Sequence, residues 1–342
     1  MVDHSTMHLG KHPARRDART LRLARYVQSS LPPAPAAVDY SCAITDWGLM
    51  LNDQLGCCTI AGVAHAVQVW TANAGTEVTV PDSVVLNYYQ TWDGYNPANP
   101  ATDQGGTELD VLNDWHQQGF SGRALDAYGA LELDAGPHLR LPMMDVMDAI
   151  WLFGGAYIGL ELPLSAQNQE VWGIAQGGGP IKISQKAKVK SQNSKVQATL
   201  SLGVPNCHVW EFAQRPGGAK ARQKSKGKSQ KAKPTSTLSP GVLIHKVWEI
   251  AQRACGAKAS QQSPDEPGSW GGHAVYVVGY DSETLTCITW GQLKKMTWAW
   301  FAQYCSEAYG LVSKDWLKAS GISPSGFDLA TLEADLAEVS GG

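Results

Sequence analysis

The sequence predicts an α+β protein in which a helical first half precedes a β-rich second half. Apolar residues recur at the spacing of a helix with one buried face, at Ile60, Val63, Val67 and Trp70. Far along the chain, residues 274–278 form an unbroken apolar run rich in valine, which is typical of a buried strand. With 342 residues, of which 43% are hydrophobic and 17% charged, the chain can bury a large core. We expect a cleft where the two halves meet.

Shorter segments extend both halves. Apolar spacing and turn signals predict helices over 84–89, 108–118, 145–153 and 328–339, and strands over 156–162 and 284–290. The aromatic-rich segment 297–305 is expected to be a helix or the junction of a strand and a helix. The strands are expected to build a barrel-like second half.

Cys58 lies in the first turn of the first predicted helix, after the polar turn 52–56. Unpaired N–H groups at a helix start lower the pKa of a thiol, and the thiolate is the nucleophilic form. The alternative is that Cys58 is a small buried hydrophobe among Ile, Ala and Val. A thiol nucleophile needs a base supplied by the fold, and His273 opens the apolar strand after a pair of glycines.

These motifs resemble those of the papain-like cysteine peptidases. Gln54 to Ala61 resembles the family's Gln-Gly-x-Cys-Gly-x-Cys-Trp-Ala-Phe, and Gly272 to Asp281 resembles its Asn-His-Ala-Val-x-Val-Val-Gly-Tyr. Val38-Asp39-Tyr40 and Trp290-Gly291 are similar to its Val-Asp-Trp and its later Trp-Gly. The resemblance covers Val38 to Leu317 apart from one long insertion. It implies a papain-like fold with a cleft between the halves, and a cysteine peptidase or amide hydrolase acting on a peptide or protein.

In this reading Cys58 is the nucleophile and His273 the base, and no cofactor is expected. Two positions depart from the family pattern. The family glutamine lies six residues before the nucleophile, whereas Gln54 lies four before Cys58 and Asn52 occupies position six. The family asparagine is replaced by Ile288, so we expect the neighbouring Thr289 to orient His273. Gln54 and the backbone N–H of Cys58 are expected to hold the oxyanion. The alternative is a papain-like binding protein that is weakly active or inactive.

The domain boundaries follow from composition. Residues 1–37 form a basic, Pro-rich arm, interpreted either as a partner-binding arm or as a solvated leader lying on the domain surface. This arm is shorter than the propeptides of the family, so an inhibitory prosegment is not expected. The papain-like domain spans 38–320, and 321–342 form a C-terminal tail.

An insertion over 171–246 carries tandem repeats of 38 residues. Val171-Trp172 recurs as Val209-Trp210 and as Val247-Trp248. Between 182 and 233 there are eleven lysines and two arginines against one acidic residue. This composition predicts a mobile basic loop, because it buries too little apolar surface to offset ordering. It is expected either to bind an anionic partner weakly or to be a tolerated surface extension.

Cysteine usage and the termini exclude some classes of protein. Seven cysteines, an odd number without regular spacing, argue against a complete disulfide framework. The sequence has no Cys-x-x-Cys pair, so no structural metal site is expected. No apolar segment of membrane-spanning length and no signal peptide is recognised, which predicts a cytoplasmic protein. A net charge of -3 gives no reason to invoke nucleic acid.

Overall fold

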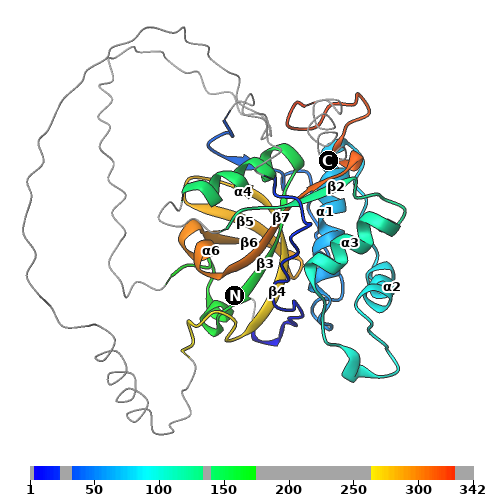
Figure 1. Ribbon diagram of the computed structural model, residues 1–342, viewed down its shortest axis with the longest axis vertical. Helices are drawn as coiled ribbons and strands as arrows, with labels where there is room; N and C mark the ends of the chain where they lie inside the picture. The colour runs from blue at the N-terminus through cyan, green and yellow to red at the C-terminus, as the bar shows by residue number, and fades with distance from the viewer. Residues whose placement is uncertain (1–3, 24–32, 134–139, 175–262, 328–342) are drawn as a thin grey trace, which may run out of the picture. The chain divides into compact units, whose positions relative to one another are not determined.

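The computed structural model describes residues 4–23, 33–133, 140–174 and 263–327, with the side chains of 140–142 excepted. Contacts divide the chain into two units, 1–207 with 263–342 and 208–262, and every described residue belongs to the first. This unit is an α+β structure in which a helical part precedes an antiparallel sheet (Figure 1). The predicted terminal helix over 328–339 lies outside the described residues.

Four longer helices precede or flank the sheet. They are α1 (Cys58–Ala74), α2 (Asp82–Trp92), α3 (Glu108–Gln118) and α4 (Arg140–Phe153), and a short helix α6 (Trp298–Tyr304) lies between two strands. Short 3-10 turns are η1 (His4–Thr6), η3 (Pro100–Thr102), η4 (Leu164–Asn168) and η5 (Lys314–Trp316). Helix α1 is buried along fourteen of its seventeen residues, which makes it the central helix of the unit.

Seven strands form one antiparallel sheet in the order β2-β7-β3-β4-β5-β6, with β1 paired to β4. The strands are β1 (Val38–Asp39), β2 (Ala127–Ala130), β3 (Ala156–Leu162), β4 (Gly271–Tyr280), β5 (Thr284–Thr289), β6 (Gln292–Thr297) and β7 (Cys305–Val312). The β-rich second half, which was expected to be barrel-like, is a single antiparallel sheet with β2 and β6 as its outermost strands.

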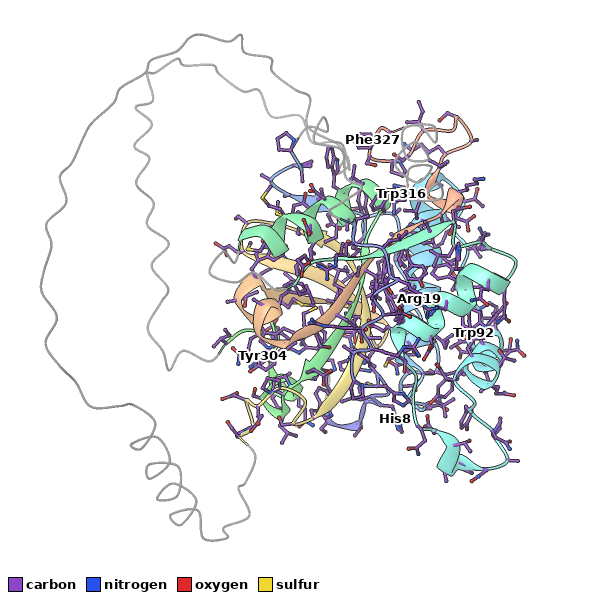
Figure 2. The ribbon with its side chains drawn as sticks, viewed as in Figure 1. His8, Arg19, Trp92, Tyr304, Trp316 and Phe327 are labelled. Atoms are coloured by element: carbon purple, nitrogen blue, oxygen red, sulfur yellow. The ribbon has the colours of Figure 1, made fainter. Side chains whose placement is uncertain are left out.

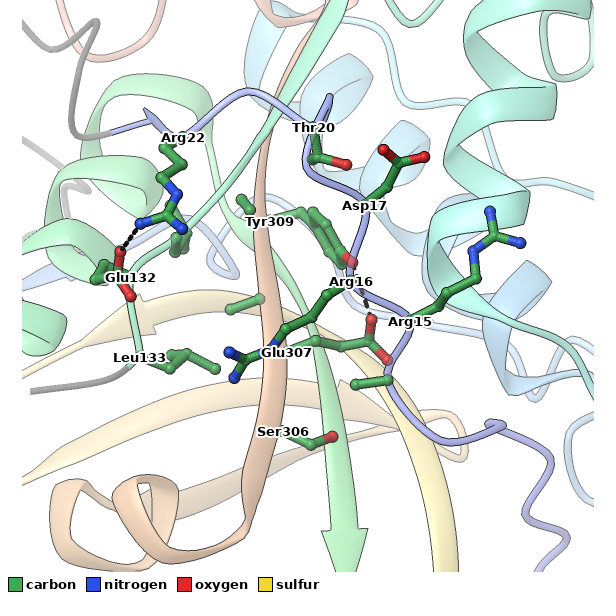
Figure 3. Close-up of a pocket in the computed structure, with 14 residues that line it drawn as sticks. Arg15, Arg16, Asp17, Thr20, Arg22, Glu132, Leu133, Ser306, Glu307 and Tyr309 are labelled. Carbon is green, nitrogen blue, oxygen red and sulfur yellow. Dashed lines mark hydrogen bonds and ion pairs between the residues drawn. The ribbon is translucent and has the colours of Figure 1, made fainter.

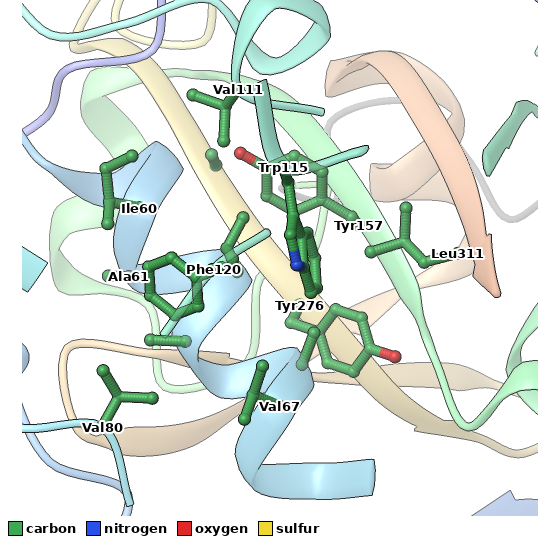
Figure 4. Close-up of a cluster of buried hydrophobic side chains, with 14 of the residues drawn as sticks. Ile60, Ala61, Val67, Val80, Val111, Trp115, Phe120, Tyr157, Tyr276 and Leu311 are labelled. Carbon is green, nitrogen blue, oxygen red and sulfur yellow. The ribbon is translucent and has the colours of Figure 1, made fainter. Parts of the chain in front are cut away.

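The sheet has a hydrophobic cluster on each face, because successive side chains of a strand point to opposite sides. Tyr157 and Tyr276 pack in one cluster with α1, α2 and α3. Ile158 and Val277 pack in the other with α4 and α6. Figure 4 shows the first cluster, where Ile60 and Val67 of α1 lie among side chains from the strands and from α3. Helix α1 is thus held between the sheet and the other helices.

Most predicted elements are present, with shifted bounds. The helix expected from 145 begins at Arg140, and the strand expected to end at Trp290 ends one residue earlier. The segment 297–305 proves to be a strand end, helix α6 and the start of β7. Among the described residues, no helix is long and apolar enough to cross a membrane.

The first residues of the insertion, 171–174, are described by the structure, and Trp172 among them belongs to the core. Residues 175–246, which were expected to bind an anionic partner weakly, lie outside the described residues. Trp172 is fully buried and stacks on Trp300 with ring centroids 4.9 Å apart. Its backbone N–H donates to Lys295 O at 2.9 Å, and its carbonyl accepts from Thr297 N at 2.9 Å. The first Val-Trp copy therefore docks against β6.

This docking makes the deletion of 171–246 a defined experiment. The deletion joins Glu170 to Val247-Trp248, so Trp248 can replace Trp172. We expect the shortened protein to unfold cooperatively, with a free energy of unfolding within about 1 kcal/mol of the full chain, because loop length changes closure entropy slowly. In that background Trp248→Ala should cost about 3–5 kcal/mol by cavity formation. Chemical denaturation measures both values. Loss of the cooperative transition in the deletion, or no effect of Trp248→Ala, would contradict the docking role.

Candidate active site

Cys58 begins α1 and lies in the core at the junction of the helix and the sheet. The preceding turn is fixed by Asp103 Oδ1, which accepts from Gly56 N at 3.0 Å. Tyr157 on β3 donates to Thr59 O at 3.0 Å, and Thr59 Oγ1 donates to Asp93 Oδ2 at 2.9 Å. The start of the helix is therefore tied to both the sheet and the helical part.

His273 lies near the start of β4, where Thr289 and Trp290 fix its ring. Its Nε2 and Thr289 Oγ1 are 2.7 Å apart, and both residues are buried. The ring stacks on Trp290, with centroids 4.5 Å apart and planes 17° from parallel. Trp290 and Gly291 both have positive φ, at 46° and 71°, in the two-residue turn between β5 and β6. This turn presents the indole to the imidazole.

The thiol of Cys58 meets β4 next to His273. Its Sγ accepts from the backbone N–H of Ala274 at 3.4 Å, and the backbone N–H of Gly10 also bonds to it. Burial raises the pKa of Cys58 to about 11 in spite of these two donors. Burial likewise lowers the pKa of His273 to about 3. Cys58 and His273 are therefore both neutral near pH 7. The sequence predicted a lowered pKa for the thiol, because it lies at a helix start, whereas in the structure its pKa is raised.

The two amides considered for the oxyanion differ in their surroundings. The side chain of Gln54 is exposed and donates to its neighbour Asp53 at 3.3 Å. Asn52 is buried, and its Nδ2 donates to Leu55 O at 3.1 Å and to His8 O at 3.4 Å. The indole Nε1 of Trp290 donates to the same His8 carbonyl at 3.4 Å. Asn52, at position six before the nucleophile, is thus the amide directed at the chain that covers Cys58.

That covering chain is the N-terminal arm. Lys11 N donates to Gly272 O at 3.0 Å on the sheet side, and Gly106 N donates to Gly10 O at 2.8 Å on the helical side. A side chain at Gly10 would collide with the carbonyl of Gly56, so only glycine fits over the thiol. Figure 2 marks His8 and Arg19 along the course of the arm. Lys11 is therefore buried in a segment that was expected to be a solvated leader or a partner-binding arm, while His8 and His12 beside it are exposed.

The buried side chain of Lys11 anchors the arm in an acidic cluster, in which Glu307 is buried and Glu161 is partly exposed. Lys11 is 5% exposed, and its Nζ lies 3.1 Å from Glu161 Oε1 and 3.1 Å from Glu307 Oε1. Burial alone would lower the pKa of Lys11, but Glu108, Glu307 and Glu161 together raise it. If the arm left, the carboxylates of the cluster would lose the ammonium that pairs with them, and a buried charge without a partner is costly. The cluster therefore holds the arm in place.

Comparisons with known proteins find matches among solved structures alone. No family model and no curated protein matches the chain. Xylellain, a cysteine protease from Xylella fastidiosa, matches with 10% identity and a TM-score of 0.48 over 90% of this chain and 97% of that one. The digestive procathepsin L 3 of Tenebrio molitor larval midgut matches with 12% identity and a TM-score of 0.42 over 90% of this chain and 77% of that one. Both are papain-like cysteine proteases, the family that the sequence motifs resemble.

Alkylation of Cys58 should report the position of the arm. With a pKa of about 11, only about one Cys58 thiol in ten thousand is ionised at pH 7, so iodoacetamide should react slowly with the wild type. Lys11→Ala should raise the rate at least about tenfold by favouring local opening, and should move the midpoint of the pH profile down from 11. Peptide mapping by mass spectrometry measures the rate.

The control is Arg19→Met, which removes an exposed cation of the same arm that pairs with Asp17. Its Cys58 alkylation should match the wild type. Equal rates in the wild type and Lys11→Ala would show that Lys11 does not keep the arm over the thiol.

Proposed function

We propose that this chain is a cysteine peptidase or amide hydrolase that acts through Cys58 and His273. One observation carries the proposal: the thiol of Cys58 accepts the backbone N–H of the residue that follows His273. A buried thiol at a helix start and an oriented imidazole are the two groups that acyl transfer needs. The closed arm keeps the dyad neutral, so the proposed reaction belongs to the form in which the arm has left the thiol.

The proposed chemistry uses the two ring nitrogens of His273 differently. With Nε2–H donating to Thr289 Oγ1, Nδ1 is the basic nitrogen, and it makes no hydrogen bond among the described residues. Nδ1 takes the proton of Cys58 while Sγ forms a bond to the substrate carbonyl carbon. The C–N bond then breaks, and the same proton goes to the leaving amine. Water hydrolyses the thioester and restores the thiol.

The proposed oxyanion donors are the backbone N–H of Cys58 and the side-chain amide of Asn52. Asn52 is favoured over Gln54 because its Nδ2 already donates to a carbonyl of the chain lying over Cys58. Such a donor is typically worth about 3–4 kcal/mol in the transition state. Gln54 remains the candidate expected from the sequence, and a change of the 50–55 turn would be needed to bring its exposed side chain to the site.

A papain-like binding protein is the alternative function. It is favoured by the raised pKa of the Cys58 thiol, and because His273 is held by the hydroxyl of Thr289, the neighbour of the position where the family has an asparagine. In that case the cleft would hold a peptide without turnover, as the arm is held here. The two functions differ in a single measurable property, hydrolysis that depends on Cys58.

Hydrolysis of a peptide library by Lys11→Ala, read by mass spectrometry, tests the proposal. Cleavage should be lost in the Lys11→Ala, Cys58→Ala double variant and kept in Lys11→Ala, Cys57→Ala, which changes the adjacent thiol. Thr289→Val should lower kcat by about tenfold to a hundredfold, because the imidazole loses its partner, and Thr289→Ser should restore it. Cleavage that survives removal of Cys58 would sink the mechanism. Absence of cleavage by a Lys11→Ala protein whose Cys58 alkylates readily would favour the binding protein.

A further inference from the structure

The acidic cluster that holds Lys11 is built by the folded unit and not by the arm. Glu161 lies on β3, Glu307 on the neighbouring β7, and Glu108 is the first residue of α3. Ser306 Oγ donates to Glu161 Oε1 at 3.1 Å, and Tyr309 OH donates to Glu307 Oε2 at 2.9 Å. These contacts hold the carboxylates of Glu161 and Glu307 without the help of Lys11. The pocket is therefore built by the sheet and the first turn of α3.

The pocket is shaped for a long side chain that ends in a cation. A Cβ on Gly159 of β3 would collide with Cδ and Cε of Lys11, so the glycine leaves room for the stem. The ammonium then reaches Glu161, Glu307 and the carbonyl of His12, the last at 2.9 Å. Among the described residues, no three His, Cys, Asp or Glu side chains are arranged to hold a metal ion. The geometry suits an organic cation on a flexible chain.

Lys11 does not use all of the acceptors in the pocket. Glu108 is fully buried, and neither of its carboxyl oxygens has a hydrogen-bond partner among the described residues. Burial, and then the charge of Glu307, raise the pKa of Glu108. A lysine offers three donors, whereas an arginine offers five in a planar fork. A guanidinium could therefore satisfy oxygens that the ammonium leaves without a partner.

The pocket lies next to the thiol of Cys58, because the residue of the arm that fills it, Lys11, follows the residue that covers the thiol. Gly10 covers Cys58 Sγ, and Lys11 follows it with its N–H on the carbonyl of Gly272, the residue before His273. An extended peptide bound in the place of the arm would therefore direct a side chain into this pocket. Lys11 of the arm forms a parallel β-bridge with Gly106.

Glu307 also lines a hollow on the outer side of the cluster. Arm residues line one side of it, and β7 and the end of β2 with the residues that follow it line the other. Figure 3 shows Arg22 of the arm bonded to Glu132, and Tyr309 bonded to Glu307. The arm thus forms a removable wall beside Glu307. Withdrawal of the arm would expose both the thiol and the acidic pocket to the same ligand.

We propose that Glu108, Glu161 and Glu307 form the specificity subsite of the enzyme and take the lysine or arginine side chain of a peptide substrate. Lys11 is the intramolecular occupant of this subsite. The proposal rests on the proposed peptidase function, because it names the substrate class of that cleft. It also makes a claim about cation binding that needs no catalysis.

The first experiment measures substrate preference in Lys11→Ala with peptides that place arginine, lysine, norleucine or glutamate at each position in turn. At one position arginine and lysine should exceed norleucine in kcat/KM by at least about tenfold, since charge-assisted hydrogen bonds form to buried acceptors. Glu307→Gln and Glu161→Gln should each reduce this preference, whereas the exposed control Glu283→Gln should leave it unchanged. Cleavage with no preference for a basic residue would overturn the subsite and leave the peptidase intact.

The second experiment needs no turnover and uses n-butylammonium as the side-chain probe. In the Lys11→Ala, Cys58→Ala variant this amine should raise Tm by about 2 °C or more with rising concentration, while n-butanol should not. Lys11→Arg, which keeps a cation in the pocket, should fold like the wild type and show no rise. A rise in this variant, together with no peptide hydrolysis by the Lys11→Ala protein that keeps Cys58, would support the subsite and refute the peptidase. No difference between the amine and the alcohol would overturn the subsite.

Discussion

The packing of α1 against the sheet is the constraint on which the site depends. The helix is buried on nearly all sides, so its first turn cannot move without disturbing the core. Tyr157 ties that turn to β3, and the thiol of Cys58 bonds to β4 at Ala274. The position of the thiol beside His273 is therefore set by core packing and not by any direct attraction between the two side chains.

Burial competes with the helix start in setting the state of the thiol. N–H groups and the macrodipole lower the pKa of a thiol by a modest amount, whereas full burial in an apolar core raises it by several units. In this structure burial dominates, because Cys58 is fully buried and Gly10 of the arm lies over its Sγ. The arm in turn stays in place because the ammonium of Lys11 is surrounded by carboxylates. We therefore expect the reactivity of the thiol to depend on the ion cluster around Lys11, one residue along the arm from Gly10.

Parts of this arrangement could be predicted from the sequence, because they depend on local patterns. The helical spacing after Cys58 and the apolar run after His273 indicated α1 and β4. The contact of Thr289 with the imidazole was expected from the family resemblance and not from a local pattern, and the two atoms lie 2.7 Å apart. Strand β7 was not predicted, because its small and polar residues give no clear alternation.

The burial of Lys11 could not be predicted, because it depends on contacts between distant residues. Lys11 stands in a basic segment that reads as solvated, and its partners Glu161 and Glu307 are brought together by the pairing of β3 with β7. The same holds for Asn52, since its direction follows from the turn before α1 and not from its spacing. Trp172 was assigned to a polar insertion, although its ring is part of the core.

In the proposed mechanism Cys58 becomes acylated, with His273 as its base. Trapping the acyl group measures this directly: Lys11→Ala is incubated with a p-nitrophenyl ester, quenched in acid and mapped by mass spectrometry. We expect a mass gain on the peptide that contains Cys58. Neutral hydroxylamine should remove it, as expected for a thioester, and it should be absent in the Lys11→Ala, His273→Ala double variant. Acylation of another residue, or acylation of Cys58 that is unaffected by the loss of His273, would contradict the mechanism.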